Sequence, residues 1–138
     1  MASAHRKIRV LICNQYVLFR EGIKCLIGDG TLIEIVGEAD TARQAIDQTA
    51  RLRPDVVLMD LMTPDLSGFE ATRRIKAVHP DVRVLILSLR DDDALASRCF
   101  EAGASGYVRP NDRAWQLQSA IDSVCARGEY RSQRAGTG

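Results

Sequence analysis

Hydrophobic and polar positions along this chain form two kinds of segment that alternate. Short apolar runs rich in Val, Ile and Leu are typical of strands buried on both faces of a parallel sheet. Longer stretches with apolar residues at every third or fourth position indicate helices that pack one face on such a sheet. The two kinds follow each other five times. Strands are predicted over residues 8–12, 32–36, 56–59, 82–87 and 106–108, and helices over 17–27, 42–52, 69–78, 93–102 and 113–126.

Five successive strand–helix units predict an α/β domain with a doubly wound, five-stranded parallel sheet and helices on both faces. Glu34 makes the second run more polar than the first, third and fourth, which suits an edge strand. The flavodoxin-like order 2-1-3-4-5 places that strand at an edge and the first and third strands side by side. We expect a flexible tail over residues 1–5, the domain over 6–128, and a linker or disordered tail over 129–138, which has no apolar periodicity.

Two of the predicted helices begin after residues that can cap them. Thr41 stands three residues before Gln44, and Ser67 stands three residues before Glu70, which is the spacing of a capping box. The predicted connections are short, as strand–helix units require.

The composition narrows the class of protein mainly by exclusion. The 138 residues carry a formal net charge of +1, which gives no electrostatic reason to expect nucleic acid or a membrane surface as a direct partner. No apolar stretch approaches the roughly 20 residues of a membrane span, and the first residues lack the apolar core of a signal peptide. We therefore expect a cytoplasmic protein. The four cysteines lack metal-ligand spacing and are expected to be free thiols.

Polar side chains follow the predicted strands. Asn14 and Gln15 follow the first strand, Asp60 the third, Ser88 the fourth and Pro110 the fifth. Ligands of open parallel sheets bind outside the carboxyl ends of the strands, so we expect these residues to meet there. Asp60 has no base beside it in the sequence. The residues alone leave it three roles: nucleophile, metal ligand or capping group.

Several longer motifs point to one family. They are VLFREGI, EIVGEAD, RPDVVLMDL, SGFEATRRI, HPDVRVLILS and EAGASGYV. Over residues 6–127 the chain resembles the receiver domain of bacterial two-component response regulators, most of all the subfamily usually fused to a helix-turn-helix DNA-binding output. The resemblance implies that a sensor histidine kinase is a partner and that Asp60 is the phosphoacceptor. It also implies that Met62 offers a backbone carbonyl to Mg²⁺, that Ser88 is the switch hydroxyl and that Tyr107 is the switch aromatic.

The sequence departs from the family pattern at the places that carry charge. Asn14 and Gln15 stand where the family has an acidic pair, and Pro110 stands where it has a lysine, with Arg109 one residue earlier. Leu89, after Ser88, is larger than the residue usual there. Mg²⁺ prefers carboxylates and dehydrates reluctantly, so we expect its binding through Asp60 and Met62 to be weak or absent.

Three functions compete at this stage. The first is a phosphorylation-controlled receiver that acts on a DNA-binding output domain not present in this chain. The second is a pseudo-receiver, a dimerisation or interaction module set by partners or ligands. The third, a phosphatase with an Asp nucleophile, would need a second acid where Met62 stands, so we expect no enzyme.

A homodimer is also expected, with Trp115 as the candidate interface residue. Trp115 lies away from the buried stripe predicted for the last helix. The stripe consists of Leu117, Ala120, Ile121, Val124 and Cys125.

Overall fold

The computed structural model describes residues 6–27, 32–90, 92–109 and 113–131, without the side chains of Ala114, Trp115 and Arg131. Strands and helices alternate along these residues, as the hydrophobic pattern predicts. The strands are β1 (Ile8–Cys13), β2 (Ile33–Ala39), β3 (Val56–Asp60), β4 (Arg83–Leu87), β5 (Gly106–Val108) and β6 (Tyr130–Arg131). The helices are α1 (Val17–Ile27), α2 (Ala42–Leu52), α3 (Gly68–Val78), α4 (Asp93–Glu101) and α5 (Ala114–Arg127).

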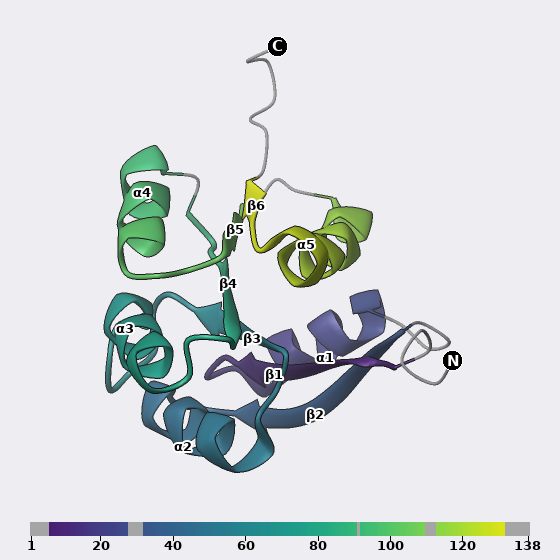
Figure 1. The fold of residues 1–138 in the computed structure, drawn as a ribbon, viewed down its shortest axis with the longest axis horizontal. Coiled ribbons are helices and arrows are strands. Elements are labelled where there is room, and N and C mark those ends of the chain that lie inside the picture. The colour runs from purple at the N-terminus through teal and green to yellow at the C-terminus, as the bar shows by residue number, and fades with distance from the viewer. Residues whose placement is uncertain (1–5, 28–31, 91, 110–112, 132–138) are drawn as a thin grey trace.

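The strands form one parallel sheet with the order β2-β1-β3-β4-β5-β6, so the predicted order 2-1-3-4-5 is confirmed. Helices α2, α3 and α4 cover one face of the sheet, and α1 and α5 cover the other (Figure 1). Each face has its own apolar core, because the inward residues of every central strand alternate between the two sides. The strands β1, β3 and β4 are almost wholly buried. No helix in the described ranges has the length and apolar character needed to cross a bilayer.

Two strands differ from the prediction by more than one residue at an end. Strand β2 continues to Ala39, beyond the predicted end at residue 36. Side chains of α1 and α2 hold Glu38 through polar contacts, and Ala39 is buried in the core. Strand β6 was not predicted at all. After α5, Gly128 adopts a left-handed conformation that turns the chain, and the Tyr130 amide then donates to the Ser105 carbonyl at 2.9 Å. Residues 130 and 131 thus extend the sheet past the predicted domain end at 128.

The starts of α2 and α3 are capped by the predicted residues. The Thr41 hydroxyl accepts the Gln44 amide at 3.2 Å, and the Ser67 hydroxyl accepts the Glu70 amide at 3.1 Å. The start of α3 also lies hard against β3: a Cβ on Gly68 would come within 2.7 Å of the Asp60 carbonyl oxygen. Only glycine therefore fits at Gly68 without moving the backbone that carries Asp60.

Candidate functional site

The carboxyl ends of β1, β3 and β4 bring the predicted polar residues to one edge of the sheet. Cys13 is in register with Met59, and Asp60 is in register with Leu87. Asn14 therefore follows β1 beside Asp60, and Ser88 follows β4 on the other side. Pro110, the residue at the lysine position of the family, lies outside the described residues.

Asp60 is the central acidic residue of this edge and is partly buried. Its Oδ1 accepts the Met62 amide at 3.2 Å. Burial raises the pKa of the Asp60 carboxyl above its ordinary value, and the backbone amides of Met62 and Leu61 offset the effect only in part. Asp60 forms no ion pair with any residue in the described ranges. Among the described residues, the backbone amides of Leu61 and Met62 are the groups that stabilise its negative charge.

Asn14 and Gln15 are both engaged in hydrogen bonds inside the loop that follows β1. The side-chain oxygen of Asn14 accepts the Tyr16 amide at 2.8 Å. The side-chain nitrogen of Gln15 donates to the Met62 carbonyl at 3.2 Å. That carbonyl is the one that the family resemblance assigns to Mg²⁺. The Gln15 side chain thus uses one of the two lone pairs of that carbonyl oxygen.

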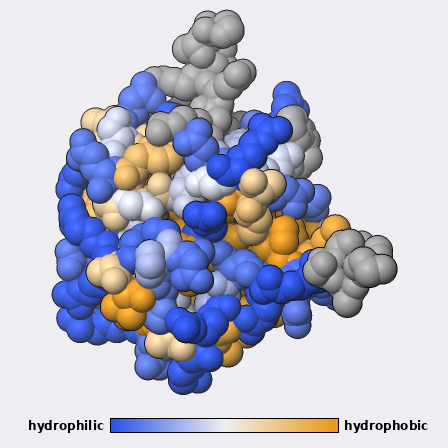
Figure 2. Space-filling view, in the orientation of Figure 1, coloured by the Kyte–Doolittle hydropathy of each residue, from blue (hydrophilic) through white to orange (hydrophobic). Residues whose placement is uncertain are grey.

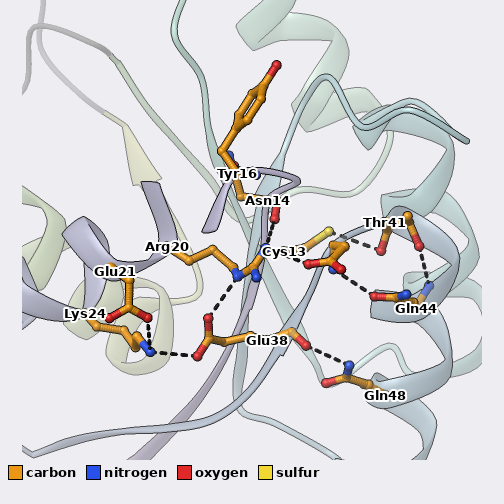
Figure 3. A network of polar contacts seen from close by, with 11 residues as sticks. Cys13, Asn14, Tyr16, Arg20, Glu21, Lys24, Glu38, Thr41, Gln44 and Gln48 are labelled. Carbon is orange, nitrogen blue, oxygen red and sulfur yellow. Dashed lines mark hydrogen bonds and ion pairs between the residues drawn. The ribbon is translucent and has the colours of Figure 1, made fainter. Parts of the chain in front are cut away.

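A network of charged side chains from α1 and β2 contacts the same loop (Figure 3). The guanidinium of Arg20, a buried residue of α1, donates to the backbone carbonyl of Asn14. It also pairs with Glu38 at 2.9 Å and with Asp40 at 2.8 Å. Lys24 pairs with Glu38 at 2.8 Å, and this contact is the main reason that the pKa of Glu38 lies below its ordinary value.

Sequence reasoning missed the role of Arg20, although a signal for it was present. Arg20 stands three residues before Ile23 and seven before Ile27, on the buried stripe of α1. A charged residue on such a stripe is almost never buried without a partner. Glu38 and Asp40 both form ion pairs with Arg20. Their negative charges are therefore compensated by Arg20 and are not free to attract a cation to Asp60.

The oxygen atoms around Asp60 do not make a good Mg²⁺ site. Asp60 contributes a carboxylate, but the oxygens of Asn14 and Met62 already accept N–H groups. Within the described ranges, no group of three or more His, Cys, Asp or Glu side chains could hold a metal ion. Mg²⁺ needs near-octahedral oxygen ligands and charge to replace its water. The residues present do not meet that demand.

Ser88 and Tyr107 both form hydrogen bonds with the backbone of Arg90, in the loop between β4 and α4. The Ser88 hydroxyl accepts the Arg90 amide at 2.9 Å. The Tyr107 hydroxyl donates to the Arg90 carbonyl at 2.7 Å, and burial raises the Tyr107 pKa. Both side chains are only 2% exposed. The two predicted switch residues are thus linked through Arg90, with the tyrosine ring turned into the protein.

Arg109 does not reach toward Asp60 as a substitute for the lysine. Its guanidinium pairs with Asp93 of α4 at 2.9 Å and lies 5.4 Å from the centre of the Tyr107 ring. The guanidinium of Arg109 therefore lies on the α4 side of β5. Trp115 lies in α5, but its side chain is outside the described residues, so its predicted exposure stays a prediction.

Comparison with known proteins agrees with the motifs. The family model described as the response regulator receiver domain matches residues 10–122. The chain is 35% identical over 125 residues to the response regulator GacA of Pseudomonas viridiflava, covering 91% of this chain and 58% of that protein. It is 36% identical over 124 residues to the transcriptional regulatory protein DegU of Brevibacillus brevis, covering 90% of this chain and 52% of that protein. The chain thus spans about half the length of these curated relatives.

Solved structures give the same result. A LuxR-family two-component response regulator from Aurantimonas sp. SI85-9A1 superposes with a TM-score of 0.86 at 34% identity, covering 91% of this chain and 89% of that one. The signal receiver domain of a putative response regulator NarL from Mycobacterium tuberculosis superposes with a TM-score of 0.81 at 26% identity, covering 88% and 99%. With its strand order, its edge acid and these matches, the chain belongs to the response regulator receiver domain family of two-component signal transduction.

Proposed function

We propose that this domain is a receiver with a weakened phosphorylation site, which passes a signal to a DNA-binding output without depending on efficient phosphotransfer to Asp60. The observation that supports the proposal is the hydrogen bond from Gln15 to the Met62 carbonyl, 3.2 Å long. It places a neutral amide where receiver domains typically hold Mg²⁺. Phosphoryl transfer gains several kcal/mol from metal charge, and each ~1.4 kcal/mol is tenfold in rate.

The partners in this proposal are a sensor histidine kinase and a second copy of the chain. DNA would be contacted only by an output domain, as in the relatives named as transcriptional regulators. No catalytic role is proposed for the domain, because among the described residues the hydrogen bonds to Asp60 come from backbone amides and not from a second acid or base. A conventional phosphorylated receiver is the competing reading, since Asp60, Ser88 and Tyr107 stand at the positions that the family uses.

Treatment with acetyl phosphate and Mg²⁺ separates the two readings. We expect mass spectrometry of the intact protein to detect little or no adduct, because no described cation pairs with Asp60 to offset the incoming negative charge. The receiver domain of the GacA relative, treated in parallel, is the positive control. Rapid, near-complete phosphorylation that Asp60→Ala abolishes would overturn the proposal and restore phosphate control.

A further inference from the structure

An apolar groove with a volume of about 740 Å³ lies between α1 and α5. Leu18, Phe19 and Leu26 line it from α1, and Leu117 lines it from α5. Leu18 is 84% exposed, which is unusual for a leucine that flanks a concave surface. Figure 2 shows hydrophobic surface gathered between the positions that α5 and α1 occupy in Figure 1, to the right of centre. Pockets of this size and lining are typical of small-molecule sites.

A glycine in the middle of α1, Gly22, lines the groove. A Cβ added to Gly22 would meet no atom within 4 Å. Glycine inside a helix costs about 1 kcal/mol relative to alanine. The space above Gly22 is therefore empty in a position where a larger side chain would both fit and favour the helix.

Among the described residues that line the groove, Arg109 and Arg113 are the charged ones. The guanidinium of Arg109 pairs with Asp93 of α4, on the other face of the sheet, so the positive charge at the groove is that of Arg113. Both arginines follow the end of β5, on the same side as Ser88 and Leu89, which also line the groove. The groove thus combines an apolar body with a cationic end beside the loop after β4.

We infer that this groove binds a small amphipathic organic anion, with its apolar part over Gly22 and its acidic group near Arg113. Apolar burial would supply most of the affinity, and the arginine would fix the orientation. The occupant would touch Ser88 and Leu89, and Leu89 is 72% exposed and free to pack on it. Binding itself stands on the groove alone. A change in the loop between β4 and α4 on binding, where Ser88 and Tyr107 contact Arg90, would rest on the proposed function.

The probe is anilinonaphthalene sulfonate, an aromatic monoanion whose fluorescence rises in apolar sites. With about 20 non-hydrogen atoms at ordinary ligand efficiency, we expect saturable one-to-one binding with a dissociation constant on the order of 10 µM. Gly22→Trp should fill the groove and weaken binding at least tenfold, whereas the matched control Gly22→Ala should keep it. Circular dichroism and thermal melting establish that each variant is folded. Asp60→Ala should bind the probe unchanged, which separates this inference from the phosphorylation proposal.

The charge is tested with phenylnaphthylamine, the uncharged analogue of the same probe. Arg113→Gln should weaken the anion by about tenfold, the value of one charge-assisted contact, and leave the neutral analogue unchanged. Equal losses for both probes would overturn the charge assignment. Binding that does not saturate, or that Gly22→Trp leaves intact, would overturn the site. Loss of probe signal as the protein self-associates, followed by sedimentation, would assign the groove to a second copy instead.

Discussion

Restoring the acidic pair should create a Mg²⁺ site. The change is Asn14→Asp together with Gln15→Asp. It adds two carboxylates beside Asp60 and removes the amide that donates to the Met62 carbonyl. The main-chain positions already match those of the family, because the ends of β1 and β3 are held in register by the sheet. We therefore expect that charge, rather than geometry, limits the affinity of the natural sequence for Mg²⁺.

The size of the effect follows from electrostatics. Two unit charges 4 Å apart attract by about 4 kcal/mol at an effective dielectric constant of ~20. Desolvation cancels most of this gain, and a net ~1.4 kcal/mol for each carboxylate is tenfold in affinity. Two carboxylates then lower the dissociation constant about 100-fold, from roughly 100 mM to roughly 1 mM. At ~10 mM Mg²⁺ the double variant should gain about 1.4 kcal/mol of stability, against less than ~0.1 kcal/mol for the natural sequence.

Thermal melting with and without MgCl₂, at constant ionic strength, measures this difference. For a domain of this size the gain corresponds to a rise of about 5 °C in the melting temperature of the double variant. Arg51→Gln with Arg127→Gln is the charge-matched control, because it changes the net charge equally at the last turns of α2 and α5. Calorimetry showing sub-millimolar binding to the natural sequence, or no gain in the double variant, would refute the reasoning.

Three further predictions concern single residues. Asp60→Asn should stabilise the protein at neutral pH by on the order of 1 kcal/mol or less, since burial disfavours the charged carboxyl. Because the folded-state pKa is raised, this advantage should shrink as the pH falls through that pKa and vanish below the unfolded value; an advantage that grows toward acid in melts from pH 7 to 3 would contradict it. Gly68→Ala should lose about 1–3 kcal/mol in denaturant unfolding, because its Cβ would meet the Asp60 carbonyl, whereas Gly22→Ala should gain up to ~1 kcal/mol. Trp115→Ala should weaken self-association in sedimentation while leaving the melting temperature nearly unchanged, and a large loss of stability would place the indole in the core instead.

The sequence predicted the fold well where apolar periodicity decides the structure. The bounds of α1 and α2 agree with the prediction to the residue, because each helix has a clear apolar stripe. Apolar periodicity failed to predict strand pairing where the strand is very short or its residues are polar. Strand β6 has two residues, too few to show alternation. Near the end of β2, the charged Glu38 is held by a polar contact with Arg20, which apolar periodicity does not reveal.

The site was predictable in position but not in its contacts. Register along parallel strands brings Asn14, Asp60 and Ser88 to one edge, and spacing alone implies that. The bond from Gln15 to Met62 joins residues 47 apart, and the bridge from Tyr107 to Arg90 joins residues 17 apart. Such contacts depend on rotamers and loop paths, which local sequence patterns do not encode.

The sixth strand has a consequence for how copies of this domain can meet. Without it, β5 would end the sheet and offer its backbone amides and carbonyls to any passing strand, the usual start of edge-to-edge aggregation. Tyr130 and Arg131 pair with Gly106 and Tyr107, so the outer side of β5 already has a backbone partner there. Within the described residues the new outer edge is two residues long, and so short an edge is a poor template for another chain. Association on this side of the molecule must therefore use side chains, which can be specific, rather than strand addition, which is not.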